Sequence, residues 1–178
     1  MAVDLGTGDG RSVLHTARCE PGTLAIGIDP DVASMRRAAG TAARGRLTNA
    51  LFVVASVEAL PEDLEGVADH VSILFPWGSL LRGIVAGAPG TLDAIAALLR
   101  PGAEVTAMWS IADRDRRHVA IEPLATDDLA LAAARCGLVV LEQRLATPDQ
   151  IDATGSTWAK RLRAGRAREV TFLRARRS

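Results

Sequence analysis

The residues whose types and spacing point most clearly to a chemical function lie in the run Val3-Asp4-Leu5-Gly6-Thr7-Gly8-Asp9-Gly10. Three glycines at alternate positions let the backbone approach a ligand closely, because no Cβ stands in the way. Asp29 ends the next apolar run, where a carboxylate can accept hydrogen bonds from two ribose hydroxyls. This pairing predicts a nucleotide-type cofactor. The alternative is a glycine-rich turn between a strand and a helix that binds nothing.

Two of the three tryptophans stand where they could hold an acceptor. Trp77 follows the fourth apolar run directly, at the carboxyl edge where open α/β sheets bind substrates. Trp158 precedes Lys160 and Arg161. Aromatic faces with adjacent cations are how proteins hold an unstacked nucleotide. Trp109, at the end of a continuous apolar run, is expected to pack in the core or at the edge of the sheet.

Basic residues are concentrated at the end of a chain whose formal net charge is zero. From Trp158 onward the only acid is Glu169, whereas the basic residues are Lys160, Arg161, Arg163, Arg166, Arg168, Arg174, Arg176 and Arg177. Such asymmetry is typical of a face that binds phosphates. A solvated basic tail is the other interpretation, and charge alone favours neither.

The elements that position these residues alternate between strand and helix, which predicts a parallel sheet covered on both faces. Strands are expected over 2–5, 24–28, 51–55, 71–75, 104–109, 138–144 and 169–174, and helices over 11–19, 31–43, 91–99 and 127–136. A turn at Arg100-Pro101-Gly102-Ala103 is expected to deliver the fifth strand. The segment from Asp113 to Arg117 is too polar for the core and is expected to be a surface loop.

The length of 178 residues fits a single domain, 1–178. The connection at about 146–165, between the last two strands, is long for a hairpin, and connections of that length are usually functional or disordered. There is no apolar run long enough to span a bilayer and no signal peptide pattern, so we expect a cytoplasmic protein. Two cysteines and three histidines lack metal-ligand spacing, so no metal site is expected, and both cysteines are expected to be buried.

The glycine spacing is similar to that of class I S-adenosylmethionine (SAM) methyltransferases, since dinucleotide-binding folds use G-x-G-x-x-G. Over almost its whole length the chain also resembles the KamB and NpmA type of aminoglycoside-resistance 16S ribosomal RNA methyltransferases. The resemblance implies a Rossmann-like fold with a mostly parallel seven-stranded sheet, and methylation of N1 of adenine 1408 in the 30S subunit. The matching blocks are Asp4-Leu5-Gly6-Thr7-Gly8-Asp9-Gly10, Glu58-Ala59-Leu60-Pro61, Phe75-Pro76-Trp77-Gly78-Ser79-Leu80-Leu81-Arg82-Gly83 and Ser156-Thr157-Trp158-Ala159-Lys160-Arg161-Leu162.

The resemblance implies a role for particular positions. Trp77 and Trp158 would grip the flipped target base, with Ser156 lining the pocket. The residues that would bind SAM are Asp4, Gly6, Gly8, Asp29, Val57, Glu58 and Ser79. Those that would contact rRNA are Lys160, Arg161, Arg166 and Arg168, together with Arg36 and Arg37 after the second strand. For the last two, a solvated helix face is the alternative.

The sequence leaves other functions open. Family members begin with a β-hairpin extension, whereas this sequence begins at Met1-Ala2-Val3, so the resemblance implies that the N-terminal extension is missing. A SAM- or RNA-binding module without catalysis is therefore one alternative. A SAM methyltransferase for a small molecule is another. An enzyme that must reach a ribosomal groove is expected to act as a monomer, with the 30S subunit as its partner and no membrane.

Overall fold

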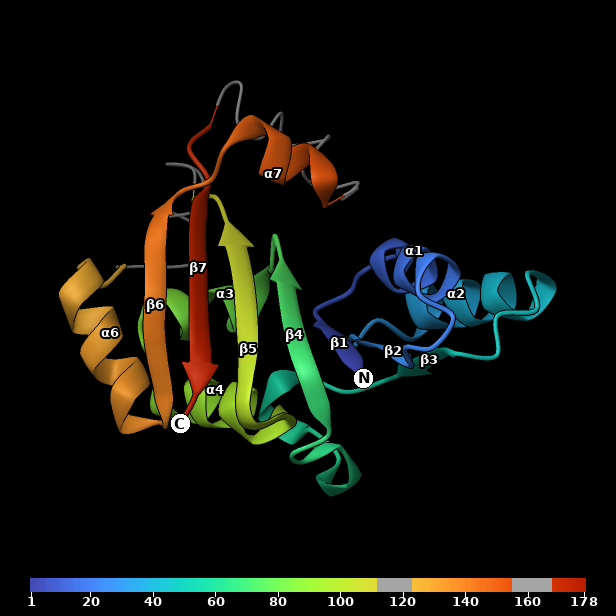
Figure 1. The fold of residues 1–178 in the computed structure, drawn as a ribbon, viewed down its shortest axis with the longest axis horizontal. Helices are drawn as coiled ribbons and strands as arrows, with labels where there is room; N and C mark the ends of the chain where they lie inside the picture. Colours follow the sequence, from blue (N-terminus) through green and yellow to red (C-terminus); the bar gives the residue numbers. More distant parts are fainter. Residues whose placement is uncertain (112–122, 155–167) are drawn as a thin grey trace.

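The computed structural model describes residues 1–111, 123–154 and 168–178, which form strands and helices in alternation (Figure 1). The elements are β1 (Ala2–Leu5), α1 (Arg11–Cys19), β2 (Ala25–Ile28), α2 (Val32–Arg44), β3 (Ala50–Val53), the 3-10 turns η1 (Val57–Ala59) and η2 (Glu62–Leu64), β4 (Ala68–Leu74), α3 (Gly78–Val85), α4 (Pro89–Leu98), β5 (Leu99–Trp109), α6 (Thr126–Arg135), β6 (Leu138–Leu145), α7 (Pro148–Ala153) and β7 (Thr171–Arg177). The predicted Asp113–Arg117 loop lies outside the described residues.

The strands form one seven-stranded sheet in the order β3-β2-β1-β4-β5-β7-β6. The neighbours from β3 to β5 pair in parallel, whereas β7 is antiparallel to both β5 and β6. The expectation of a mostly parallel seven-stranded sheet is confirmed, and the sheet is mixed because β7 returns beside β6 as in a hairpin.

Helices cover both faces of the sheet, as predicted. Successive side chains of a strand point to opposite faces. In β2, Ile26 belongs to the large core cluster that includes Leu81 and Ile84 of α3, whereas the adjacent Ala25 packs with Val13 of α1. Figure 1 shows α3 and α4 behind β4–β7 and α6 beside β6, while α1 and α2 gather at the β1–β3 half.

Several sequence predictions need correction. The expected turn at Arg100–Ala103 lies inside β5, where the pairing with β4 jumps from Ala68↔Leu99 to His70↔Glu104, so the glycine and proline produce an irregularity in a longer strand. Helices α3 and α7 were not predicted. Cys19 is exposed and Cys136 half-buried, because both lie at helix ends rather than on a buried face.

A small apolar cluster lies at the carboxyl ends of the central strands, apart from the main core. Its buried members, which we call the edge cluster, are Phe75, Met108, Ile151, Val170 and Phe172. They come from the ends of β4 and β5, from α7 and from the start of β7. The cluster therefore joins the segment after β4 to the helix that follows β6.

No single helix within the described ranges is both long and apolar enough to cross a membrane. One bent pair, α3 with α4, reaches that threshold by length and composition alone, with an angle of 101° between the two helices. Both helices contribute residues to the main core.

Candidate functional site

The loop between β1 and α1 takes a backbone shape that requires its glycines. Gly6, Gly8 and Gly10 have φ angles of +75°, +59° and +71°, in the left-handed region that a Cβ disfavours. Space is also limiting, because a Cβ on Gly6 would lie 2.9 Å from Leu80 Cδ2 and one on Gly10 would lie 2.6 Å from Ala38 Cβ. The alternate glycines thus leave a loop of exposed backbone at the end of β1.

Asp29, at the tip of β2, holds this loop and the next helix together. Its Oδ2 accepts a hydrogen bond from the Gly8 N–H at 2.9 Å, and its Oδ1 accepts one from the Asp31 N–H at 2.9 Å. Asp31 in turn caps α2 by accepting from the N–H groups of Ala33 and Ser34. The tips of β1 and β2 are therefore connected through one carboxylate.

Asp4 lies beneath the loop, with only 6% of its surface exposed. The Ser12 and Ser72 hydroxyls donate hydrogen bonds to its carboxylate, the latter at 2.9 Å. Burial raises the pKa of Asp4 above its ordinary value, while hydrogen bonds from Ser12, Thr7 and Ser72 act in the opposite direction and the charge of Asp29 adds to the rise. The two serines were not predicted, although Ser72 stands directly beside Asp4 in the β1–β4 register.

A pocket of about 300 Å³ opens at the carboxyl edge of the sheet, above the loop. The glycine loop, the β2 tip, the segment after β3 and the start of α3 all contribute to its wall. The lining residues are Leu5, Gly6, Gly8, Ile28, Asp29, Pro30, Ala55, Ser56, Val57, Phe75, Trp77, Gly78, Ser79 and Leu80. Six predicted site residues, Gly6, Gly8, Asp29, Val57, Ser79 and Trp77, thus meet around one hollow.

Trp77 is the most exposed large apolar side chain in the described part of the chain, at 61%. It occupies the position just before α3 without a side-chain capping bond, between Phe75, which has a left-handed φ of +53°, and Gly78, with φ of +64°. Phe75 is buried and its N–H donates to the Met108 carbonyl at 2.8 Å. The turn therefore anchors the neighbouring side chain in the edge cluster and leaves the indole of Trp77 in solvent at the pocket wall. Trp109, by contrast, is 5% exposed, as predicted.

Glu58 lies at the boundary of this pocket rather than in its wall. A hydrogen bond from the Ser79 hydroxyl, and a weaker contribution from the Ser56 hydroxyl, hold the pKa of Glu58 below its ordinary value. The positive charge of Arg82 also lowers it. Glu58 lines a second hollow, of about 460 Å³, between η1–η2 and α4, and Val57 is common to both hollows. The carboxylate therefore connects η1 to the start of α3, which carries Ser79.

The predicted RNA-contacting residues are described only in part. Arg36 and Arg37 are exposed on α2, and Arg37 donates to the Ser34 hydroxyl at 3.0 Å. Arg168 is half-buried, three residues before the start of β7. The remaining predicted site residues, Ser156, Trp158, Lys160, Arg161 and Arg166, lie outside the described residues. In the part of the chain that is described, no group of three metal-ligating side chains gathers.

This strand order, with a glycine loop after β1 and an acid at the tip of β2, defines the class I SAM-dependent methyltransferase fold. A sequence model of the family described as NpmA, 16S rRNA (adenine(1408)-N(1))-methyltransferase, matches residues 1–177. The chain belongs to this family.

Individual relatives show how close the likeness is. The 16S rRNA (adenine(1408)-N(1))-methyltransferase of Streptoalloteichus tenebrarius is 32% identical over 94% of this chain and 82% of its own length. A crystal structure of a mutant enzyme of that name from Catenulisporales acidiphilia, with the cosubstrate SAM, superposes with a TM-score of 0.85, at 32% identity over 99% of this chain and 84% of the other. The crystal structure of an aminoglycoside resistance methyltransferase gives a TM-score of 0.79, at 32% identity over 99% of this chain and 86% of the other.

Proposed function

We propose that this protein transfers the methyl group of SAM to N1 of adenine 1408 in the 16S rRNA of the 30S subunit, and thereby confers aminoglycoside resistance. Family membership supports the reaction, because the curated relative of the same family bears this activity in its name. The observation that carries the proposal is the position of Trp77, an exposed aromatic plate in the wall of the pocket that also contains Gly6, Gly8 and Asp29.

The pocket fits the nucleoside part of SAM. Left-handed glycines leave room for close approach of a ligand to the backbone, and Asp29 offers a carboxylate to ribose hydroxyls. Leu5, Ile28 and Leu80 give the hollow apolar walls, as ligand pockets usually have. When bound, SAM supplies an electrophilic methyl group. We assign the cofactor-binding role to Asp4, Gly6, Gly8, Asp29, Val57, Glu58 and Ser79, with Asp4 supporting the loop from beneath.

The proposed reaction does not need a strong general base from the protein. Adenine N1 has an in-plane lone pair and attacks a methyl carbon without first losing a proton. The task of the chain is to hold the base in line, and orientation alone can account for a large part of a barrier. Trp77 and Trp158 are assigned to grip the flipped base, with Ser156 beside it, since stacking contributes about 1 to 3 kcal/mol per base.

The rRNA-contacting role is assigned to two basic groups that lie far apart in the sequence. Arg36 and Arg37 lie exposed on α2. Lys160, Arg161, Arg166 and Arg168 belong to the basic C-terminal part of the sequence, within and just after the insertion at 146–165. Cations on phosphates account for most sequence-independent affinity for nucleic acids. The proposed enzyme acts in the cytoplasm, as a monomer on assembled 30S subunits.

Primer extension on 30S subunits incubated with the protein and SAM tests the function. A reverse-transcription stop at adenine 1408 is expected, because N1 methylation blocks Watson–Crick pairing. SAM binding without a stop would support a binding module without catalysis. Methyl transfer to small molecules with no salt-sensitive binding to 30S subunits would point to a small-molecule enzyme. The variant Trp158→Ala is expected to abolish the stop while SAM affinity stays nearly unchanged, and equal loss of both would contradict the role given to Trp158.

A further inference from the structure

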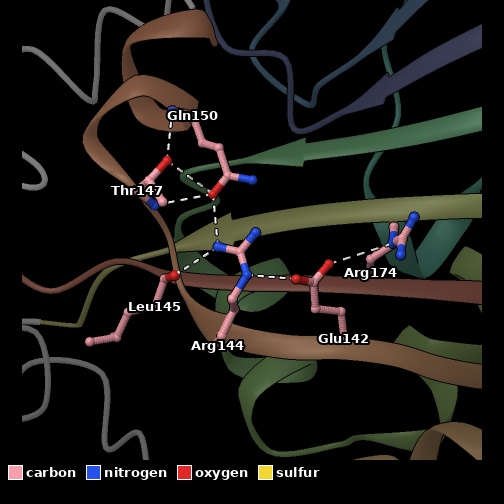
Figure 2. A network of polar contacts seen from close by, with 6 residues as sticks. All are labelled: Glu142, Arg144, Leu145, Thr147, Gln150 and Arg174. Carbon is pink, nitrogen blue, oxygen red and sulfur yellow. Dashed lines mark hydrogen bonds and ion pairs between the residues drawn. The ribbon is translucent and has the colours of Figure 1, made fainter.

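Arg144, at the end of β6, connects three elements through one guanidinium group (Figure 2). Its Nη1 donates to the Gln150 Oε1 at 2.8 Å and to the Leu145 carbonyl at 2.9 Å. Its Nε pairs with Glu142 Oε1 at 2.6 Å. The guanidinium also lies over the Phe172 ring, 4.7 Å from the centroid, in a cation–π contact. A planar group with several fixed donors can make these contacts together, whereas a lysine ammonium cannot.

The contact with Gln150 acts on helix α7, because Gln150 is part of the N-terminal cap of that helix. The Thr147 hydroxyl accepts from the Gln150 N–H at 3.3 Å, and the Gln150 Oε1 accepts from the Thr147 N–H at 3.1 Å. This is a capping box. The amide oxygen that closes the cap is thus the one that receives Arg144 (Figure 2). Helix α7 has only six residues, so its position depends on such contacts rather than on its own propensity.

The other side of α7 reaches the segment that carries Trp77. Ile151 is 3% exposed and belongs to the edge cluster with Phe75, two residues before Trp77. Phe172, on which Arg144 stacks, is a member of the same cluster. In the sequence, α7 ends at Ala153, five residues before Trp158. Arg144 therefore fixes α7 against the cluster that anchors the Trp77 segment.

We propose that Arg144 is a positioning residue for methyl transfer: acting through Gln150, it sets α7 against the edge cluster, whose member Phe75 anchors the turn that presents Trp77 at the pocket wall. This inference rests on the proposed function. It predicts a loss in kcat on 30S subunits with little change in SAM affinity, because the Arg144 contacts lie at α7 and the SAM pocket is lined by other elements. Misplacement by about 1 Å can reduce a rate roughly 100-fold.

Variants at Gln150 separate positioning from direct contact with RNA. Gln150→Glu keeps the acceptor for Arg144 and the capping box, so its kcat should stay within about twofold of wild type. Gln150→Leu and Arg144→Ala each remove the bond and should each lower kcat about tenfold. The double variant should lose less than the product of the two single losses, since both single variants remove the same Arg144–Gln150 bond. Arg176→Ala is the charge control, because Arg176 is exposed on β7 and its guanidinium makes no hydrogen bond or ion pair with the described residues.

The opposite pattern would overturn the proposal. If Arg144 binds an rRNA phosphate instead, Gln150→Leu will be nearly neutral, Gln150→Glu will weaken 30S binding, and Arg144→Ala will mainly reduce affinity and its salt dependence. Additive effects in the double variant would also contradict coupling through Gln150.

Hydrogen exchange of the peptide 148–154 tests the positioning independently of catalysis, so failure of the proposed function is distinguishable from failure of this inference. Loss of a hydrogen bond worth about 0.5 to 1.5 kcal/mol should raise exchange in Arg144→Ala by roughly 2- to 12-fold, and Gln150→Glu should match wild type. Unchanged exchange in Arg144→Ala would refute the inference even if the wild-type enzyme methylates adenine 1408. A positive exchange result with no methylation would refute the proposed function and leave only the contact between Arg144 and α7 established.

Discussion

The Asp29 carboxylate accepts a hydrogen bond from the Gly8 backbone N–H at 2.9 Å, so the acid at the tip of β2 also shapes the glycine loop after β1. One residue therefore has two tasks, preparing the loop and offering its charge to the pocket that it lines. A truncation of this side chain removes both at once, whereas an amide keeps an acceptor for Gly8 and loses the charge.

We expect Asp29→Ala to weaken SAM binding roughly 10- to 100-fold, the range for lost hydrogen bonds to a charged group. Asp29→Asn should fall between Asp29→Ala and wild type. Isothermal titration calorimetry with SAM measures both. Asp9→Ala is the matched control, because Asp9 is an exposed acid of the same loop whose carboxylate faces Arg11 at 3.3 Å. Equal weakening by Asp9→Ala would show that loop charge in general, rather than Asp29, determines affinity.

The raised pKa of Asp4 predicts a pH-dependent stability difference. In the unfolded chain Asp4 ionises near pH 3.8, but burial delays ionisation in the folded protein. The folded state is therefore favoured relative to the unfolded state below pH 3.8, and this contribution is lost as the pH rises through the folded-state pKa. Asp4→Asn should thus melt at a higher temperature than wild type at pH 7, with the difference shrinking toward pH 4. Melting curves of the cofactor-free proteins from pH 4 to 8 measure this difference. A difference in melting temperature that stays constant over this range would contradict the prediction.

Trp77 and Trp109 offer a matched pair with opposite exposure. Trp77→Ala should leave the free energy of unfolding nearly unchanged and lower methyl transfer roughly 5- to 150-fold, the equivalent of 1 to 3 kcal/mol of lost stacking. Trp109→Ala should instead destabilise the fold by about 3 to 5 kcal/mol, because it empties a buried site. Urea denaturation and 30S methylation assays measure the two quantities. A large loss of stability in Trp77→Ala would mean that the indole packs rather than binds.

Gly83 of α3 lies so close to α4 that a Cβ would overlap with the Thr91 hydroxyl. Gly83→Ala should destabilise the protein by about 1 to 3 kcal/mol despite the better helix propensity of alanine. Gly90→Ala is the control, since no atom of the described residues lies within 4 Å of a Cβ built there, and a gain of about 0.5 to 1 kcal/mol is expected. Thermal melting distinguishes them, and similar shifts of one sign would show that α3 and α4 adjust freely.

Arg36 and Arg37 are exposed on α2, the first helix after the β2 tip. Arg36→Glu should weaken binding to 30S subunits and reduce the slope of log affinity against log salt by about one for each phosphate that the protein no longer neutralises. The comparison is Arg18→Glu, an exposed arginine in the last turn of α1. Filter binding over a series of salt concentrations measures both slopes. If the two slopes are indistinguishable, the α2 arginines form an ordinary solvated helix face and do not contact rRNA phosphates.

The sequence predicts most closely those parts of the molecule that depend on local signals. The bounds of β1 and α1 agree with the prediction, because the glycine loop separates them sharply. Helix α3 was missed since its left-handed first residue, Gly78, and the closely packed Gly83 both resemble loop signals. Helix α7 is too short to show a period. The partners of Asp4 come from α1 and β4, and only the strand register brings Ser72 beside it.

The Ala146 N–H donates to the Val170 carbonyl at 2.8 Å, which ties the two ends of the excursion between β6 and β7 at its base. For a loop closed in this way, doubling the number of residues costs only about 0.6 kcal/mol of additional entropy. The length of this excursion can therefore change at little cost to the strands and the pocket, provided that Ile151 stays packed in the edge cluster.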